Sequence, residues 1–438
     1  AHEDAAVRAG RGGVEISEAP QQCSSRHKVP SSRQGERQGE VGLRVRIGIH
    51  TGLVVIGEIG SSEKREMLAL GETPNIAARI QGAANPDEVM ISTATYHLVE
   101  GLFACEDRGQ QGLKGVATPR TLYRMVKESD AHSRFEVVVR KGLTPLVGRD
   151  HELGLLCERW ERVKEGIGQV VLLSGEPGIG KSRLVEALKE TVEHEGARCL
   201  ELRCSSYAQN SALQPVIEHL QRTLEFQQAD SPDEKLRKLE QRLSRSSLDL
   251  QETVPLFASL LSLPASCFLL PAFSPQKQKE KTYEALVTWL CAEAKQQAVT
   301  YAWEDLHWAD LSTLELLTLF LNQVPTTRLL AVLTFRPEFT PPWGAHSYLS
   351  QLTLSRLGRS HVETMVEKVT DGTALPKEII QQIVSKTDGV PLFVEELTKT
   401  VLEFVASRES QNGMALQAIA IPATLQDSLM ARLDRLGT

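Results

Sequence analysis

The sequence predicts an α/β protein made of two successive units in which strands and helices alternate. Near the start, residues 43–50 alternate between apolar and polar side chains, as a half-buried strand does. Later, the strand patterns 170–173, 299–305 and 329–334 are separated by long helical patterns. That arrangement is typical of a parallel sheet covered by helices, so we expect a parallel-sheet core in the second unit.

Composition excludes several classes of protein. The chain has 438 residues and a net charge of −7, without the basic face that a general nucleic-acid binder needs. Pro255, Pro264 and Pro271 interrupt the uncharged stretch 253–276, which favours core helices over a membrane span. The seven cysteines are scattered without zinc spacing, and the charged start lacks a signal peptide pattern. We therefore expect a cytoplasmic protein with no nucleic acid and no membrane as partner.

The first unit is expected to begin after a mobile segment. Residues 1–43 include few large apolar side chains, so burial cannot offset the entropy of ordering them. A turn after the first strand leads to a second strand at 53–57, and a helix follows with Thr73 as N-cap and Pro74 at its first position. Further strands at 88–91, 103–108 and 121–126, with a short helix from Ser92, complete this unit. The charged stretch 127–145 is expected to be an irregular linker.

Asn75 and Arg79 lie four residues apart, so they project from one face of the predicted helix. From the residues alone, a solvated helix face is the favoured interpretation of this pair.

A glycine-rich loop follows the strand at 170–173. Residues 175–182 read GEPGIGKS and are followed by a helical pattern, which is the context of a phosphate-binding P-loop. Backbone N–H groups of such a loop surround phosphate oxygens, and the helix directs its positive end at them. Lys181 would neutralise the β- and γ-phosphates of ATP, and the Ser182 hydroxyl would hold Mg²⁺. The expected cofactor-binding residues of the loop are Gly175, Gly178, Gly180, Lys181 and Ser182.

Hydrolysis also requires acidic groups at the end of a neighbouring strand. The predicted strand 299–305 ends in Glu304 and Asp305. By position, Glu304 is assigned to the metal and Asp305 to the attacking water, although the reverse order stays open. Two acids that merely start a surface loop are the alternative. His307 and Trp308 are expected to pack beside the acids.

Two further elements complete the predicted site. Arg336 follows the strand 329–334 at the edge where a nucleotide would bind, so it can reach the γ-phosphate. An exposed surface arginine is the alternative. Gly389 and Pro391 interrupt two helical patterns, and this break is either a nucleotide contact or a simple helix corner.

These elements, in this order, resemble the STAND-type signalling ATPases of the AAA superfamily over residues 145–438, including the entry at 147–149. The resemblance implies that Arg336 senses the γ-phosphate and that Gly389 and Pro391 contact adenine from a helical lid. Glu304 departs from the family, where many members carry aspartate.

Residues 44–126 resemble the C-terminal half of a class III nucleotide cyclase domain. The resemblance lies in RIGIHTG at 46–52, VIGEIG at 55–60 and GETPNIAAR at 71–79. It implies that Asn75 orients the ribose and Arg79 stabilises the pentavalent phosphorus. The order of the two units is similar to that of bacterial cyclase–ATPase fusions and soluble-type adenylyl cyclases.

The resemblance also implies two metal-binding aspartates ahead of this half, but the only aspartate before residue 44 is Asp4. We therefore expect a chain truncated at both ends, inactive as a cyclase alone, whose cyclase unit could pair with an intact partner. The expected domains are a cyclase remnant at 1–43, a cyclase half at 44–126, a linker at 127–145, an ATPase core at 146–345 and a helical lid at 346–438.

The function predicted from the sequence is an ATP-binding, slowly hydrolysing signalling ATPase that uses Mg²⁺ and works with a protein partner or as an oligomer. Two alternatives stay open. One is an active adenylate cyclase regulated by the ATPase region, and the other is a non-catalytic ATP-dependent scaffold.

Overall fold

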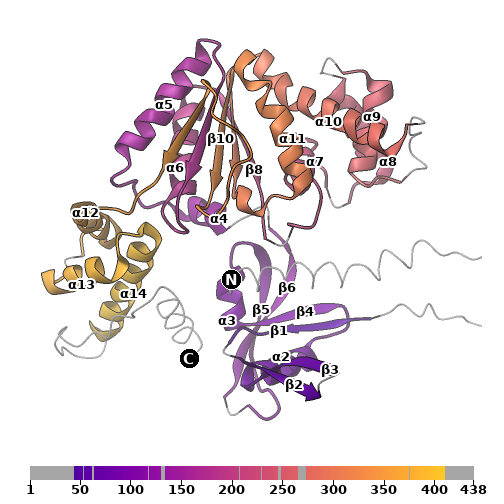
Figure 1. Cartoon of the computed structure of the whole chain (residues 1–438). Coiled ribbons are helices and arrows are strands. Elements are labelled where there is room, and N and C mark those ends of the chain that lie inside the picture. Colours follow the sequence, from indigo (N-terminus) through magenta and orange to yellow (C-terminus); the bar gives the residue numbers. More distant parts are fainter. Residues whose placement is uncertain are drawn as a thin grey trace, which may run out of the picture. The chain divides into compact units, whose positions relative to one another are not determined.

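The computed structural model describes residues 44–409 except Leu53, 62–63, 117, 130–133, 207, 228, 245–247, 265–272 and 374. The chain divides into two compact units with a boundary between Thr144 and Pro145 (Figure 1). The expectations for residues 1–43, including Asp4, and for the end of the lid beyond residue 409 lie outside the described residues.

The first unit contains a four-stranded mixed sheet in the order β1-β4-β6-β5. β1 and β4 are parallel, whereas β6 is antiparallel to both β4 and β5. Helices α2 and α3 accompany this sheet, and β2 and β3 form a separate antiparallel hairpin. The bounds are β1 (Arg46–Ile49), β2 (Val55–Ser61), β3 (Lys64–Leu70), α2 (Glu72–Ala83), β4 (Glu88–Ser92), α3 (Thr93–Val99), β5 (Phe103–Gln111) and β6 (Arg120–Glu128). β3 is an element that the sequence analysis did not predict.

The prediction that Thr73 caps α2 is wrong. The helix begins at Glu72, and its N-cap is Gly71, which has φ 132° and no side-chain cap hydrogen bond. Glycine adopts that left-handed backbone at little cost, whereas threonine does not. Ile76 and Ile80 form the buried side of α2, so Asn75 and Arg79 lie on its exposed side.

We expect the substitution Gly48→Ala to destabilise the first unit by about 1–3 kcal/mol, the usual cost of overpacking. A Cβ at Gly48 in β1 would lie 2.2 Å from the Gln81 nitrogen and 2.5 Å from the Ala77 carbonyl oxygen of α2. Hydrogen exchange of the α2 amides, measured by mass spectrometry, should therefore accelerate. Gly82→Ala in the same helix is the control, because its Cβ would meet nothing within 4 Å. Equal protection in the two variants would contradict this close packing.

The expectation of an irregular linker over 127–145 is wrong for part of that range. β6 continues to Glu128, and residues Arg134–Lys141 form the helix α4. Val137 of this helix is 9% exposed and packs in the apolar core of the first unit, next to Gly101. Burial of this apolar side chain stabilises a helix that charge content alone does not predict.

The second unit contains a five-stranded parallel sheet in the order β11-β7-β10-β9-β8. Successive side chains of the strands enter two different cores, as the period of two residues requires. Val171 and Leu173 pack with α5 and α6, whereas Val170 and Leu172 face the core shared with α7, α9, α10 and α11. The bounds are α5 (Asp150–Lys164), β7 (Gln169–Ser174), α6 (Lys181–His194), β8 (Arg198–Arg203), β9 (Val299–Glu304), α11 (Leu311–Leu321) and β10 (Leu329–Phe335).

The predicted helical region between β8 and β9 consists of α7 (Gln214–Thr223), α8 (Pro232–Leu243), α9 (Leu250–Leu260) and α10 (Pro275–Ala292), followed by the short helix η2 (Glu293–Lys295). The predicted end of the sheet at residue 345 is wrong, because β11 (Leu349–Thr353) pairs with β7. This pairing satisfies backbone groups on an edge of β7 that would otherwise stay without partners. The helices of the predicted lid follow as α12 (Arg359–Thr370), α13 (Lys377–Thr387) and α14 (Pro391–Glu409).

Three features bear on the expectations from composition. Within the described ranges, no helix is both long and apolar enough to cross a membrane. The cysteines at 105, 157, 199, 204 and 291 are free thiols. The same part of the chain holds no group of three or more His, Cys, Asp or Glu side chains with metal-site geometry.

Candidate functional site

The glycine-rich loop connects β7 to α6, as predicted. Gly178 and Gly180 have φ values of 75° and 101°, a left-handed conformation that glycine adopts without strain. Gly180 is the N-cap of α6, so the first helical residue is Lys181. The unpaired N–H groups and the positive end of α6 therefore point into the loop, which is the arrangement that binds phosphate.

Lys181 lies inside this loop and is 8% exposed. Its ammonium nitrogen Nζ donates hydrogen bonds to the carbonyl oxygens of Gly175 (2.8 Å) and Glu176 (3.1 Å). Burial lowers the pKa of Lys181, and the nearby Arg336 acts in the same direction, while Asp305 and Glu304 oppose the shift. The loop thus holds a poorly hydrated cation, which is suited to pairing with phosphate oxygens.

Glu304 ends β9 and contacts Ser182, although the two residues are 122 positions apart. The Ser182 hydroxyl donates to Glu304 Oε2 at 2.5 Å, and Arg203 Nη2 at the end of β8 contacts Oε1 at 2.8 Å. Burial raises the pKa of Glu304, but the Arg203 charge and the hydrogen bonds from Ser182 and Arg203 outweigh it, and the net shift is downward. The carboxylate is therefore ionised, and its oxygen beside the Ser182 hydroxyl makes a donor pair of the hard kind that Mg²⁺ prefers.

Asp305 adopts a left-handed backbone with φ 60°, a conformation that is uncommon outside glycine. Its backbone nitrogen donates to the Thr334 hydroxyl at 3.0 Å, which attaches it to β10. Burial raises the pKa of Asp305 and the neighbouring Glu304 adds to this shift, while Arg203, Lys181 and Arg336 oppose it. The second acid thus lies among the charged groups of the same site.

Arg336 directly follows β10, and its guanidinium lies 5.6 Å from the centroid of the Trp308 ring. Its charge also lowers the pKa of His307, which burial brings to about 4, so that the imidazole is neutral at pH 7. Both ring nitrogens of His307 are buried and lack a hydrogen-bond partner within the described part of the chain.

The break between α13 and α14 contacts the phosphate loop. The backbone nitrogen of Leu392 donates to the Gly178 carbonyl oxygen at 3.2 Å, and Pro391 begins α14. Gly389 has φ 71°, and its carbonyl accepts from the Leu357 nitrogen at 2.8 Å. The structure thus brings this Gly-x-Pro segment to the loop that the sequence predicts to bind phosphate.

Sequence reasoning missed two arginines that hold the site together. Arg203 is the last residue of β8, at the same edge of the parallel sheet as Arg336, so the argument from strand ends applies to it as well. Arg149 is 4% exposed, and its Nη2 donates to the carbonyl oxygens of Ile179 (3.2 Å) and Ser355 (2.5 Å). The entry at 147–149 contributes to the family resemblance, but that motif assigns no contact to Arg149.

Arg356 links the loop to the lid. Its guanidinium contacts both carboxylate oxygens of Glu176 at 3.0–3.2 Å and also pairs with Asp388, the residue before the Gly389 break. All three side chains are about half or more exposed, so water screens these ion pairs.

We expect Arg356→Ala to change unfolding free energy by less than about 1 kcal/mol, as is usual for exposed ion pairs. The lid, in contrast, loses a tether to the loop, and dissociation of a fluorescent ATP analogue should become severalfold faster in stopped-flow measurements. Arg359→Ala is the control, because its partner Glu363 lies in the same helix. Equal dissociation rates in the two variants would show that Arg356 does not hold the lid.

Asn75 and Arg79 belong to the first unit, and the structure leaves both exposed on α2. The Asn75 amide donates to the Gly71 carbonyl oxygen at 3.3 Å, which is a local contact at the start of the helix. The exposed face agrees with the solvated interpretation and equally leaves both side chains accessible to a ligand.

Comparisons with known proteins agree with both units. Residues 145–333 match the AAA ATPase domain family. Residues 18–127 match the adenylate and guanylate cyclase catalytic domain family. The chain therefore joins a domain of the cyclase family to a domain of the AAA ATPase family, in the predicted order, and the predicted α/β class is confirmed.

Two curated relatives and one solved structure extend this comparison. An uncharacterized protein of Rhizobium meliloti is 28% identical over 99% of this chain and 41% of its own length. Adenylate cyclase type 10 of Oryctolagus cuniculus is 20% identical over 86% of this chain and 23% of its own length. A Pyrococcus horikoshii signal transduction ATPase with numerous domains and a tetratricopeptide repeat sensor is 12% identical, with a TM-score of 0.32, over 62% of this chain and 33% of its own. The chain thus spans less than half the length of each of these relatives.

Proposed function

We propose that the second unit binds Mg·ATP and hydrolyses it slowly, as the nucleotide-dependent switch of a cyclic-nucleotide signalling protein. The hydrogen bond between Ser182 and Glu304 carries this proposal. It brings a phosphate-loop hydroxyl to the acid that ends a distant strand, which is the pairing that a Mg·ATP site requires.

Each of the grouped residues has a distinct part in this proposal. Lys181 turns from the loop carbonyls to the β- and γ-phosphates, and Ser182 and Glu304 hold Mg²⁺, which supplies charge neutralisation when bound. Asp305 orients the attacking water and accepts its proton. Arg336 leaves the Trp308 ring to contact the γ-phosphate and responds to its loss.

The lid completes the proposed switch. The backbone at Gly389 and Pro391 contacts the nucleotide base, while the Leu392 amide stays close to the phosphate loop. We place the ATPase core at 146–353 and the lid from 354 onward, because β11 belongs to the sheet. Exchange of ATP for ADP would then change how the lid packs on the loop, which a partner protein or a second copy can detect. We place this activity in the cytoplasm.

The direct test is to incubate the purified chain with Mg·ATP and to measure phosphate release and cyclic AMP in the same samples. We expect slow phosphate release and no cyclic AMP. The cyclase reaction uses two aspartates to bind its metal ions, and residues 1–43 of this chain contain one aspartate, Asp4. A chain that neither binds nor hydrolyses Mg·ATP would refute the proposal. Binding without any hydrolysis would favour the scaffold.

An active adenylate cyclase is the second candidate. The family match at residues 18–127 and the accessible Asn75 and Arg79 favour it. Because cyclase sites of this kind use two complementary halves, an intact cyclase domain should restore activity when mixed with this chain. Arg79→Ala should abolish that restored activity, whereas Arg108→Ala in β5 should not. Cyclic AMP formed by this chain without a partner would favour the second candidate outright.

A further inference from the structure

A cavity of about 260 Å³ lies at the amino-terminal ends of β8 and β9, where α7, α8, α10 and η2 meet the sheet. The proposed ATP site lies at the opposite ends of the same strands. Arg198 begins β8 and lines the cavity, whereas Arg203 ends β8 and contacts Glu304. At about 3.3 Å per residue, the two arginines are roughly 16 Å apart along the strand. The cavity is therefore separate from the phosphate loop.

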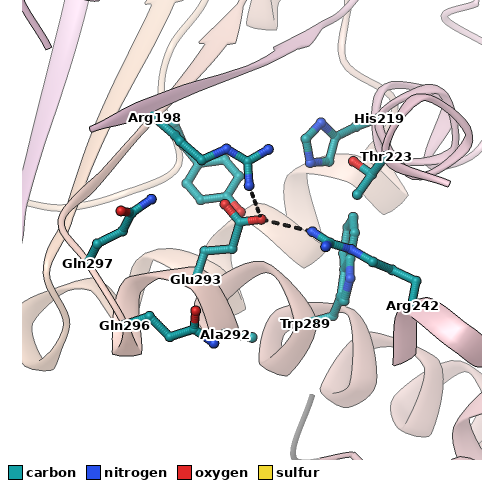
Figure 2. Close-up of a pocket in the computed structure, with 10 residues that line it drawn as sticks. Arg198, His219, Thr223, Arg242, Trp289, Ala292, Glu293, Gln296 and Gln297 are labelled. Atoms are coloured by element: carbon teal, nitrogen blue, oxygen red, sulfur yellow. Dashed lines mark hydrogen bonds and ion pairs between the residues drawn. The ribbon is translucent and has the colours of Figure 1, made fainter. Parts of the chain in front are cut away.

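Two arginines from different elements, Arg198 and Arg242, converge on the carboxylate of Glu293 in the cavity lining (Figure 2). Arg198 Nη1 of β8 donates to Glu293 Oε1 at 2.7 Å, and Arg242 Nη2 of α8 donates to the same oxygen at 3.0 Å. Each guanidinium carries five N–H donors, and one carboxylate oxygen engages only one donor of each. The side chains are 51% and 29% exposed, so unused donors remain accessible.

The remaining wall is aromatic and neutral. His219 lies 5.5 Å from Trp289 and 6.2 Å from Tyr301, measured between ring centroids, so the three rings form one continuous surface. The Tyr301 hydroxyl donates to the Leu290 carbonyl oxygen at 2.8 Å, which fixes that ring. Burial, together with Arg222, Arg198 and Arg242, lowers the pKa of His219 to about 3, so this ring carries no charge at pH 7.

The charge of the lining is consequently positive. Two guanidinium groups face a single carboxylate, and the remaining lining residues, His219, Thr223, Trp289, Ala292, Gln296, Gln297 and Tyr301, are uncharged. A cavity of this size is slightly below the range of about 300–1,000 Å³ that is usual for drug-sized ligands, so it suits a smaller metabolite.

We propose that this cavity binds a small organic anion, with a carboxylate or phosphate group held by Arg198 and Arg242 and an apolar body on the ring of Trp289. Carboxylates and phosphates are the groups that arginine pairs with most strongly, and the aromatic wall supplies apolar contact area next to them. Such a ligand contacts α7, α8 and α10 together with strands β8 and β9. The opposite ends of these two strands carry Arg203 and Glu304. Because the cavity is separate from the phosphate loop, the ligand is not the substrate of the ATPase unit.

The test is isothermal titration calorimetry of the whole chain with benzoate and with phenyl phosphate, and with uncharged benzamide as the comparison compound. We expect at least one anion to bind with a dissociation constant of about 1 mM or tighter, and benzamide to bind at least about tenfold more weakly. The preference between benzoate and phenyl phosphate distinguishes a carboxylate ligand from a phosphate ligand. Absence of binding by both anions would overturn the proposal.

Four variants separate a ligand site from an ion pair that merely supports the fold. Arg242→Gln should weaken anion binding at least about tenfold, whereas Arg237→Gln, whose partner Glu234 lies outside the cavity on the same helix, should not. Ala292→Leu leaves both arginines in place but fills the cavity, so it should abolish binding with an unchanged melting temperature. Lys181→Ala should leave binding intact, and loss of binding in that variant alone would assign the anion to the phosphate loop.

Discussion

Replacement of Lys181 by alanine is expected to lower the affinity for Mg·ATP about a hundredfold. A buried ammonium that pairs with phosphate oxygens makes charge-assisted hydrogen bonds, and loss of such a bond costs about 1.5–3 kcal/mol. The structure adds a reason for a large effect. Lys181 is 8% exposed and poorly hydrated within the loop, so little hydration is lost when it pairs with phosphate. Isothermal titration calorimetry at fixed Mg²⁺ concentration measures the change.

Lys164→Ala is the matched control for this variant. Lys164 is an exposed lysine of α5 that pairs with Glu161 and Glu195, away from the phosphate loop. Both variants should stay folded, so their circular dichroism spectra should match that of the parent chain. If Lys181→Ala bound Mg·ATP as tightly as Lys164→Ala, the phosphate loop would not be the nucleotide site.

Asp305→Asn is expected to reduce ATP turnover about a hundredfold or more while affinity for Mg·ATP stays within about threefold. A positioned base contributes roughly 10²–10⁴ to the rate, and an amide cannot accept the proton of the attacking water. Phosphate release under saturating Mg·ATP and calorimetric binding measure the two quantities separately. Glu338→Gln is the control, because this exposed acid follows Arg336 closely and acts on Lys181 only through its charge. Equal loss of turnover and affinity would instead assign Asp305 to metal binding.

The pH dependence of turnover follows from the charge of Asp305. Burial and the neighbouring Glu304 raise its pKa above the usual value, so the carboxylate is lost as pH falls through that raised value. Turnover should therefore decline on the acidic side at a higher pH than an ordinary aspartate would produce. The decline should be absent from the residual activity of Asp305→Asn.

The raised pKa of Asp305 also lowers the stability of the fold at neutral pH. The folded chain binds the proton of Asp305 more tightly than the unfolded chain does, so ionised Asp305 destabilises the fold above its folded-state pKa, and the penalty disappears as pH falls. Asp305→Asn should therefore raise the melting temperature at pH 7 while it lowers turnover. Strained or poorly solvated groups of this kind are common at functional sites.

The local parts of the site could be read from the sequence. The loop at 175–182 is recognised from its glycines and from the helix that begins at Lys181. All of these residues are close together in the sequence. Glu304, Asp305 and Arg336 follow apolar strands, and the carboxyl ends of parallel strands meet at one edge of a sheet. Three features were not predicted. The cap of α2 depends on the backbone angle of Gly71, and β11 depends on pairing with the edge of β7. The helix α4 depends on the burial of Val137.

What the tertiary structure alone decided is the set of contacts between segments that are distant in the chain. Arg149 contacts Ser355, which lies 206 positions away in the chain, and Arg356 links Glu176 to Asp388. Neither arginine belongs to a periodic sequence pattern that would predict these contacts. The cavity at Arg198 and Arg242 likewise arises only where four helical elements meet two strands. The sequence by itself determined the type of each unit and the phosphate loop, because these depend on spacing within a few residues. A site that depends on side chains from separate elements needs the packing of those elements, since distance along the chain carries no information about distance in space.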